Sequence, residues 1–307
     1  MDYLFKEEDI LVSDRQGETV KKGISIVIPA YNEEGGIAPV LQAVDEVLAA
    51  TTLSYEIIVV NDGSQDNTRG AIQHSGVDLI VVNHDVNRGY GASLKTGIRR
   101  AQYATIVITD ADGTYPNGRI PELVRLSEEG YDMVVGARVG QDVHIPALRR
   151  PPKWVLRKLA NYLTDMEIPD LNSGLRVMRR EVVERFMNIL PNGFSFTTTI
   201  TLSLLTNGYN VKYIPIDYHR RTGQSKIRPI RDTLNFLQLI LRTVLYFEPL
   251  KIFIPASLLV LGVGLALFSC GWFLFGVVLD ISFIVLVTCA IQLVAIGLLA
   301  DLFDKRL

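Results

Sequence analysis

Short runs of apolar residues alternate with amphipathic segments along the first two thirds of the chain. Five runs rich in Val and Ile predict strands, at 24–29, 55–61, 78–83, 104–110 and 131–136. Continuous apolar runs of this length are typical of strands that are covered on both faces. Helix-like segments lie between them, near 34–50, 66–75, 90–102 and 118–129. The alternation predicts an α/β domain built around a mostly parallel sheet.

Two much longer apolar runs follow near the C-terminus. The first, 252–279, holds no charged residue, and Asp280 separates it from the second, 281–300. At about 1.5 Å per residue, the second run would form a helix of about 30 Å, which matches the hydrocarbon core of a bilayer. Buried core helices are the alternative, but such helices rarely stay uncharged for so long. We therefore predict a transmembrane helical hairpin that turns near 279–282.

Charged residues beside these runs predict the orientation of the hairpin. Basic residues flank both runs, namely Arg228, Arg231, Arg242, Lys251, Lys305 and Arg306. The positive-inside rule places both flanks in the cytoplasm. The N-terminal segment is polar and acidic, and it lacks the basic and apolar regions of a signal peptide. These features predict a multi-pass protein of the inner (cytoplasmic) membrane, with its large N-terminal domain and both termini in the cytoplasm.

Composition argues against several other classes of protein. The formal net charge is −2 over 307 residues, and no nucleic-acid motif occurs, so a nucleic-acid partner is not expected. Cys270 and Cys289 lie in apolar runs, where we expect buried free thiols rather than a disulfide. The four histidines lack the spacing of zinc ligands.

Polar motifs follow four of the predicted strands in succession. They read IPAYNEE, NDGSQDNT, NRGYGAS and DADG. Because ligands of open α/β sheets bind at the carboxyl ends of the strands, the four motifs predict one shared site. NRGYGAS lacks the third glycine of a dinucleotide-binding loop, and no GK[ST] phosphate loop occurs. Gly89 and Gly91 are instead expected to allow a tight turn or the close approach of a ligand.

The paired carboxylates of Asp110 and Asp112 end the fourth predicted strand. Residues two apart in an extended chain point to the same side, so both side chains could converge on one hard cation. Oxygen ligands favour Mg²⁺ or Mn²⁺, which commonly bridge to substrate phosphates. A solvated turn is the alternative, since Asp and Gly are ordinary turn residues.

Two further acidic residues follow earlier predicted strands. Asp62 could accept hydrogen bonds from a nucleotide base or ribose, or it could belong to a turn before a capped helix. Glu33 could act in the same way, or it could interact with the dipole of the next helix.

Positive charge gathers downstream of the predicted strands. Basic residues precede the motif DLNSGLR at 170–176, namely Arg138, Arg149, Arg150, Lys153, Arg157 and Lys158, and HRRTGQSKIRPIR follows at 219–231. Anionic lipid headgroups, the phosphate of a lipid substrate, or both would suit this charge. The apolar segment 232–247 suits a helix that lies in the membrane interface.

Together these motifs resemble the family 2 glycosyltransferases, most closely the polyprenyl-phosphate group of dolichol-phosphate mannose synthase and its bacterial glucosyltransferase relatives. The resemblance covers about residues 23–230 through IPAYNEE, VVNDGSQDNT, NRGYGAS, DADG, GAR, DLNSGLRVMRR and RRTGQSK. It implies an N-terminal arm (1–22), a GT-A nucleotide-sugar-binding catalytic domain (23–229), an interfacial amphipathic helix (230–249) and two transmembrane helices with a short tail (250–307).

The resemblance also implies roles for individual residues. The nucleotide-binding positions are Pro29, Tyr31, Glu33, Asp62 and Asp110, and the metal-binding positions are Asp110 and Asp112. The catalytic positions are Asp112, Arg138 and Asp170, where Asp170 would orient a basic residue or contact the sugar. The acceptor-phosphate positions are Arg138, Ser173, Arg220 and Lys226, with Arg221 as the alternative to Arg220. Some relatives have a metal-ligating Gln where this chain has Thr114, so water could complete the metal shell.

By resemblance, the chain is an enzyme that transfers a hexose with inversion to a polyprenyl phosphate, with Mg²⁺ or Mn²⁺ as cofactor and UDP-glucose as the expected donor. A phosphate monoester has a second pKa of about 6, so this nucleophile needs no strong general base. The expected partners are the nucleotide-diphosphate sugar, the lipid and the membrane, and a homo-oligomer stays open. GDP-mannose as donor, a processive polysaccharide synthase and a catalytically silent scaffold that binds nucleotide sugars are the alternatives.

Overall fold

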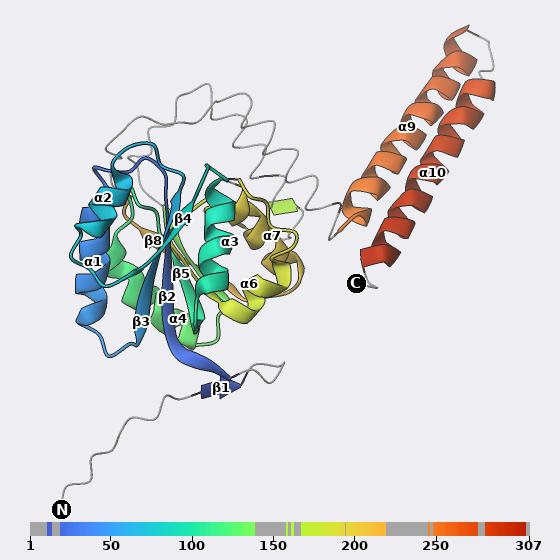
Figure 1. The fold of residues 1–307 in the computed structure, drawn as a ribbon. Helices are drawn as coiled ribbons and strands as arrows, with labels where there is room; N and C mark the ends of the chain where they lie inside the picture. Colours follow the sequence, from blue (N-terminus) through green and yellow to red (C-terminus); the bar gives the residue numbers. More distant parts are fainter. Residues whose placement is uncertain are drawn as a thin grey trace, which may run out of the picture. The chain divides into compact units, whose positions relative to one another are not determined.

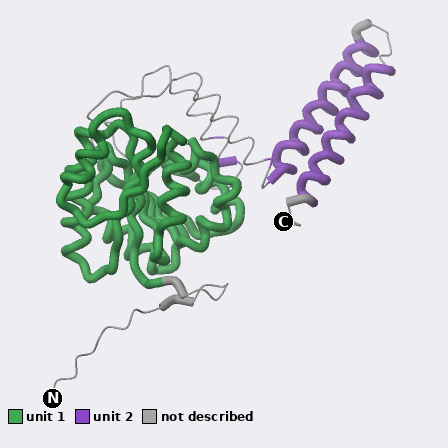
Figure 2. Tube along the Cα trace, viewed as in Figure 1, with its two compact units in different colours: residues 1–150, 167–228 green, residues 151–166, 229–307 purple. Residues whose placement is uncertain are grey.

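The computed structural model describes residues 11–13, 19–138, 158, 161–162, 167–193, 195–218, 245, 248–275 and 280–304. The chain divides into two compact units, residues 1–150 with 167–228 and residues 151–166 with 229–307 (Figure 2). The first unit contains the sheet and the second contains two long helices (Figure 1). The predicted domain boundaries stay predictions, and the predicted interfacial helix lies almost entirely outside the described residues.

The sheet of the first unit has the strand order β4-β3-β2-β5-β7-β6-β8, with β1 paired to β2 outside this path. The strands are β1 (Leu11–Ser13), β2 (Thr19–Ala30), β3 (Tyr55–Asp62), β4 (Ile80–His84), β5 (Tyr103–Ile108), β6 (Met133–Arg138), β7 (Arg176–Arg179) and β8 (Val211–Ile216). Strands β2 to β5 pair in parallel, as do β6 and β8, whereas β7 runs antiparallel to β5 and β6. The predicted mostly parallel sheet is confirmed.

All five predicted strands are present, but the sequence pattern missed β1, β7 and β8. Strand β7 has only four residues, and its sequence RVMR begins and ends with arginine. Strand β8 reads VKYIPI, where polar residues and a proline interrupt the apolar run, because it lies at the edge of the sheet. Strand β5 ends at Ile108, two residues earlier than predicted.

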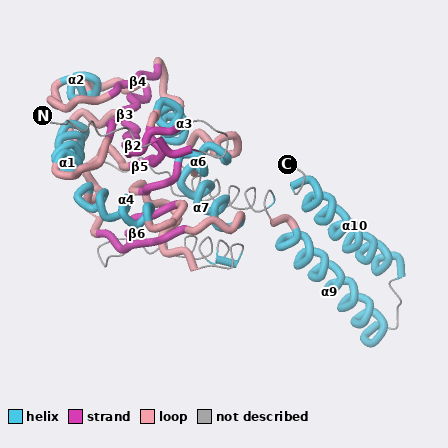
Figure 3. Tube along the Cα trace, turned by 90° about the horizontal axis from the view of Figure 1, so that it is seen from below, coloured by secondary structure: helices cyan, strands magenta, loops and turns pink. Residues whose placement is uncertain are grey.

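Helices cover both faces of the sheet (Figures 1 and 3). One face carries α1 (Ile37–Ala49), α2 (Thr68–Gln73) and α4 (Ile120–Glu128), which follows a 3-10 turn at Asn117–Arg119; the other carries α3 (Tyr90–Arg100), α6 (Arg180–Phe186) and α7 (Phe196–Thr206). Within β2, Ile26 and Ile28 join the core under α1, whereas Val27 joins the core under α3. Two cores thus sandwich the sheet, which explains its continuous apolar strands.

The second unit contains α9 (Leu250–Phe275) and α10 (Asp280–Asp304), which pack against each other. Their segments Leu250–Phe273 and Ile281–Leu302 are long and apolar enough to cross a membrane. Small residues and aromatic rings contribute to the contact between them. The Ser257 hydroxyl donates to Ala290 O at 2.9 Å, Gly297 packs against Phe253, and the ring centres of Phe268 and Phe283 lie 5.1 Å apart. Both cysteines are free, as expected, but they are exposed rather than buried because they lie on outward faces of the pair.

Candidate active site

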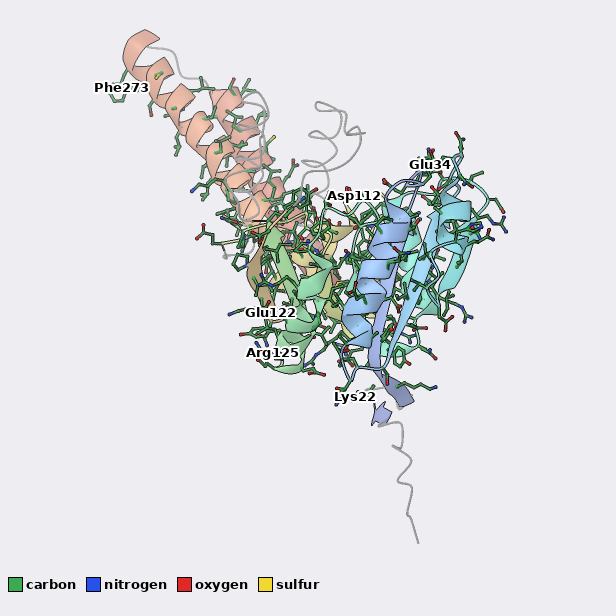
Figure 4. All side chains as sticks on the ribbon, turned by 90° about the vertical axis from the view of Figure 1, so that its left-hand side faces the viewer. Lys22, Glu34, Asp112, Glu122, Arg125 and Phe273 are labelled. Atoms are coloured by element: carbon green, nitrogen blue, oxygen red, sulfur yellow. The ribbon has the colours of Figure 1, made fainter. Side chains whose placement is uncertain are left out.

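The loops that carry the four polar motifs meet at the carboxyl edge of the sheet. The backbone N–H of Asn32 donates to Ser64 Oγ at 3.0 Å, and that of Glu33 donates to Thr68 Oγ1 at 2.8 Å. A Cβ on Gly36 would lie 2.9 Å from Ala111 O, so the loop after β5 packs directly against the loop after β2. Figure 4 shows Glu34 and Asp112 at the same end of the domain, opposite Lys22 near the start of β2.

Three of the predicted nucleotide-binding residues, Pro29, Tyr31 and Glu33, are half-buried around the end of β2. Pro29 pairs with Val60 of β3, while the pairing of β2 with β5 stops earlier, so the missing N–H is tolerated. The Glu33 carbonyl accepts hydrogen bonds from the first backbone N–H groups of the segment that opens α1. Contact of these side chains with a nucleotide stays a prediction.

Asp62 is only 3 % exposed, and its carboxylate binds other parts of the protein. It accepts hydrogen bonds from the backbone N–H groups of Arg88 at 2.9 Å and Gly89 at 2.8 Å, and it lies 2.6 Å from His84 Nδ1. A carboxylate has about four lone-pair sites, so most of its capacity is already used. In this structure Asp62 anchors the loop after β4, and its predicted contact with the nucleotide stays untested.

The glycines of NRGYGAS allow protein backbone, not a ligand, to approach closely. A Cβ on Gly89 would lie 2.5 Å from Asn192 O, and one on Gly91 would overlap Pro191 O. The Ala92 N–H donates to Asn192 O at 3.0 Å across this contact. The start of α3 is therefore joined to the segment that leads into α7.

The predicted metal ligands Asp110 and Asp112 lie in the loop after β5, not in the strand. Because β5 ends at Ile108 and the chain turns at 111–112, the argument that extended residues two apart share a side does not apply here. Each carboxylate instead has a hydroxyl that orients it. Tyr90 Oη donates to Asp110 Oδ1 at 3.0 Å, and Thr114 Oγ1 donates to Asp112 Oδ1 at 2.6 Å.

These contacts bear on how a cation would be held. Thr114 is fully buried with its hydroxyl on Asp112, so its evident task is to position that carboxylate. Among the described residues, no group of three or more His, Cys, Asp or Glu side chains could hold a metal ion. Two carboxylates nevertheless fit Mg²⁺ or Mn²⁺, which usually takes its other oxygen ligands from phosphates and water.

Two tyrosines that the sequence reasoning missed surround Asp110. Burial raises the pKa of both Tyr90 and Tyr115, and the negative charge of Asp110 raises them further. Both phenols therefore stay protonated near neutrality. Tyr115 Oη accepts the backbone N–H of Gly174 at 2.6 Å, and a Cβ on Gly174 would lie 2.7 Å from both Asp110 carboxylate oxygens. The loops at 110–115 and 170–174 are thus in direct contact.

The predicted catalytic pair Arg138 and Asp170 forms a bidentate ion pair. Arg138 donates from Nε to Oδ2 at 2.7 Å and from Nη2 to Oδ1 at 2.8 Å, and the two side chains are 25 % and 11 % exposed. Burial opposes both charges, but the hydrogen bonds and charge of the pair outweigh it, so the pKa of Asp170 is lowered and that of Arg138 is raised. Of the two roles considered for Asp170, the structure provides the one that orients a basic residue.

Aromatic rings connect this pair to the loop after β5, which carries Asp110 and Asp112. The Arg138 guanidinium lies 5.3 Å from the centre of the Tyr218 ring, and Tyr218 meets Tyr115 edge to face at 5.4 Å. Tyr218 directly precedes the basic segment that holds Arg220 and Lys226. Both of these predicted acceptor-phosphate residues lie outside the described residues.

Ser173, the other predicted acceptor-phosphate residue, is fully buried. Its hydroxyl donates to Gly136 O at 2.5 Å, so it braces the loop from inside and does not present a donor to a ligand. The expectation for Ser173 is therefore wrong in this structure. The motif DLNSGLR, which contains Ser173, also contains Arg176. Arg176 is fully buried and donates to Ser173 O at 2.7 Å and Thr201 Oγ1 at 2.6 Å.

Arg176 was not singled out by the sequence reasoning, although an arginine beside the apolar residues of a strand is a usable signal. Burial lowers its pKa, and within the described part of the chain it forms no ion pair with a carboxylate. Arg176 also donates from Nη2 to Leu171 O at 2.9 Å. Arg176 thereby joins the loop that carries Asp170 to helix α7.

Comparisons with known proteins give matches over most of the first unit. The family model described as Glycosyl transferase family 2 matches residues 25–187. A dolichyl-phosphate hexose transferase of Haloferax volcanii is 30% identical over 207 residues, which is 67% of this chain and 87% of that protein. An undecaprenyl-phosphate 4-deoxy-4-formamido-L-arabinose transferase of Shewanella sediminis is 30% identical over 269 residues, which is 85% of this chain and 76% of that protein.

A solved structure shares the fold of the first unit. It is glucosyl-3-phosphoglycerate synthase of Mycobacterium tuberculosis in complex with Mn²⁺, UDP-glucose and phosphoglyceric acid. The TM-score is 0.57 at 20% sequence identity, over 73% of this chain and 80% of that chain. At that identity the likeness shows the fold alone, and it confirms the predicted GT-A-like α/β architecture.

Proposed function

The chain belongs to glycosyl transferase family 2, and from that premise we propose that it transfers a sugar from a nucleotide-diphosphate sugar to a polyprenyl phosphate. The observation that carries the proposal is the pair Asp110 and Asp112, each oriented by a hydroxyl at the carboxyl edge of a family 2 domain. The acceptor class is supported by two relatives whose names specify dolichyl phosphate and undecaprenyl phosphate. Both acceptors are polyprenyl phosphates, whereas the named sugars differ.

We assign the donor to the edge formed by the loops after β2 and β5. Asp110 and Asp112 would hold Mg²⁺ or Mn²⁺, which when bound neutralises charge on the departing diphosphate. Tyr90 and Thr114 keep the two carboxylates oriented, because each donates a hydrogen bond to one of them. Tyr31 and Glu33, together with Pro29 and Asp62, would hold the nucleoside.

The acceptor phosphate is assigned to Arg138 with Arg220 and Lys226. Arg138 is a quarter exposed, and a guanidinium has five N–H donors, so it retains donors for a phosphate while paired with Asp170. Asp170 is engaged by Arg138 and is poorly suited to act as a base, which agrees with a phosphate nucleophile that is already ionised. The proposed step is a direct, inverting displacement by a phosphate oxygen at the anomeric carbon, with the nucleoside diphosphate as leaving group.

Helices α9 and α10 would anchor the enzyme in the membrane that holds its acceptor. Both contain segments long and apolar enough to cross a bilayer, and large apolar side chains cover their outward faces. We propose a multi-pass protein of the cytoplasmic membrane, with the catalytic domain and both termini in the cytoplasm. This placement brings a cytosolic nucleotide sugar and a lipid phosphate to the same side.

Glucose from UDP-glucose is our specific donor proposal, with GDP-mannose as the first alternative. The test incubates purified protein with Mg²⁺, undecaprenyl phosphate and a panel of labelled nucleotide sugars, and it follows label in the lipid phase. Transfer from at least one donor is expected, and transfer from none refutes the enzyme proposal. Asp112→Ala should abolish transfer, whereas Glu128→Ala, a control at an exposed carboxylate on α4, should leave it unchanged.

Two other activities give distinct products in the same assay. A processive synthase would yield a polymer rather than one sugar per lipid. A silent scaffold would bind nucleotide sugar without releasing nucleoside diphosphate. The presence of Asp110, Asp112 and the Arg138–Asp170 pair favours an enzyme over the silent scaffold, and the size of the product distinguishes single transfer from a processive synthase.

A further inference from the structure

One polar side chain lies on the outward face of the helix pair, near the middle of its second apolar segment. Gln292 is eleven residues after Ile281 and ten before Leu302, the ends of the segment that could span a membrane. At about 1.5 Å per residue, its Cα is about 15 Å from either end, near the centre of a bilayer core. The side chain is exposed, and no hydrogen bond forms to it within the part of the chain that the structure describes.

Helix α9 cannot supply that hydrogen bond, because it packs on the other face of α10. Ala290 and Gly297 are the buried residues of that face, where Ser257 and Phe253 contact them. With 3.6 residues per turn, Gln292 points about 160° away from Ala290. Thr288, the exposed hydroxyl one turn earlier, is already satisfied by Ile284 O at 2.8 Å. Unlike Thr288, Gln292 therefore has no hydrogen-bond partner among the residues that the structure describes.

An amide at this depth is costly when it faces lipid, since acyl chains offer neither donors nor acceptors. Interhelical hydrogen bonds of Gln side chains are a common remedy in membrane helices. We propose that two copies of this chain associate through the outward faces of their α10 helices, with Gln292 of each copy hydrogen-bonded to Gln292 of the other. The proposal rests on the membrane hairpin proposed above, but not on the donor sugar.

A second copy fits this position better than another partner for two reasons. Two copies inserted in the membrane in the same orientation have their Gln292 side chains at the same depth. An amide is also self-complementary, since its N–H donates to the carbonyl oxygen of a second amide while its own oxygen accepts, as a two-fold axis demands. The exposed residues around it repeat at alternating intervals of four and three, the spacing of a helix–helix seam: Val285, Cys289, Gln292, Ile296 and Leu299.

The two cysteines of the chain provide a built-in probe of this contact. Cys289 lies on the α10 seam one turn from Gln292, while Cys270 is exposed on α9. In membranes treated with copper phenanthroline as oxidant, Cys270→Ser protein should form a Cys289-linked dimer, because a disulfide requires Cα atoms within about 7 Å. Cys289→Ser protein should form at least about fivefold less dimer. Adding Gln292→Leu to the Cys270→Ser protein should lower the dimer fraction at least about threefold.

Matched controls distinguish a failure of the Gln292 contact from a failure of the membrane hairpin on which it rests. Thr288→Val also replaces an exposed polar group of α10, but one already bonded within the helix, and it should leave the dimer fraction unchanged. Undiminished crosslinking of the Gln292→Leu protein, or a dimer formed only through Cys270, would overturn the contact. Release of the unmodified protein from membranes by alkaline carbonate would overturn the proposed transmembrane hairpin. The same wash should leave each variant in the membrane, so that their crosslinking can be compared.

Discussion

Gly174→Ala should displace the carboxylate of Asp110 without straining the backbone. An ideal Cβ on residue 174 lies 2.7 Å from both carboxylate oxygens, and ordinary contact begins at 3.4 Å. The oxygens and the new methyl group must therefore separate by about 0.7 Å. Residue 174 does not have a left-handed φ, so an alanine is compatible with the local chain. The loop that faces Asp110 is also tied to Tyr115 by the Gly174 N–H, which limits its retreat.

The expected loss of activity follows from this displacement. A shift approaching 1 Å in a positioned group costs up to about 100-fold in rate. Because part of the shift is shared with the 170–174 loop, we expect kcat/KM to fall roughly 10- to 100-fold, which is about 1.4 to 2.7 kcal/mol. If Asp110 is a metal ligand, the Mg²⁺ concentration for half-maximal activity should also rise, by about tenfold.

The assay measures initial rates of sugar transfer over a range of Mg²⁺ and Mn²⁺ concentrations. Gly118→Ala is the matched control, since a Cβ at Gly118, in the turn before α4, meets nothing within 4 Å. Thermal unfolding of both variants checks that the domain remains folded. If Gly174→Ala keeps a wild-type rate and a wild-type metal dependence, the position of the Asp110 carboxylate does not control metal binding, and our assignment is refuted.

Three other substitutions test neighbouring contacts. Tyr90→Phe removes one hydrogen bond to Asp110 and should lower kcat/KM about tenfold at unchanged fold, measured by the same transfer assay. Thr114→Val preserves the shape of the side chain but removes the hydrogen bond to Asp112, so it should raise the Mg²⁺ concentration for half-maximal activity severalfold. An unchanged Mg²⁺ dependence would argue against positioning of Asp112 by this hydroxyl. Asp170→Asn breaks the pair with Arg138 and should reduce the free energy of unfolding at pH 7 by about 2–4 kcal/mol, less than for a fully buried pair because the guanidinium is partly exposed. Because the pKa of Asp170 is lowered in the folded protein, its ionised carboxylate stabilises the fold at pH values above the ordinary carboxyl pKa of about 4. This stabilisation is lost as the pH falls through the folded-state pKa. Denaturant titrations of the wild-type and Asp170→Asn proteins should therefore give converging free energies of unfolding in acid.

The apolar pattern predicted five strands of the sheet, β2 to β6. Strands β2, β3 and β5 contribute residues to both cores, so burial on both faces requires continuous apolar runs in their sequences. The same argument missed β7 and β8, whose residues are arginine-bounded or alternating. Strand β7 becomes a strand only because β5 and β6 flank it, which is a long-range contact that no local pattern encodes.

The sequence by itself determined the family, the α/β architecture, the two apolar C-terminal helices and the clustering of four motifs at one edge, because chain order in a parallel sheet dictates where strand ends lie. The tertiary structure decided what the motif residues touch. Asp62 anchors a loop, Ser173 is sealed inside the fold, and Arg138 is already paired with Asp170. Hydrogen-bond partners such as Tyr90 for Asp110 come from distant segments, and their pairing depends on the packing of whole elements rather than on any spacing along the chain.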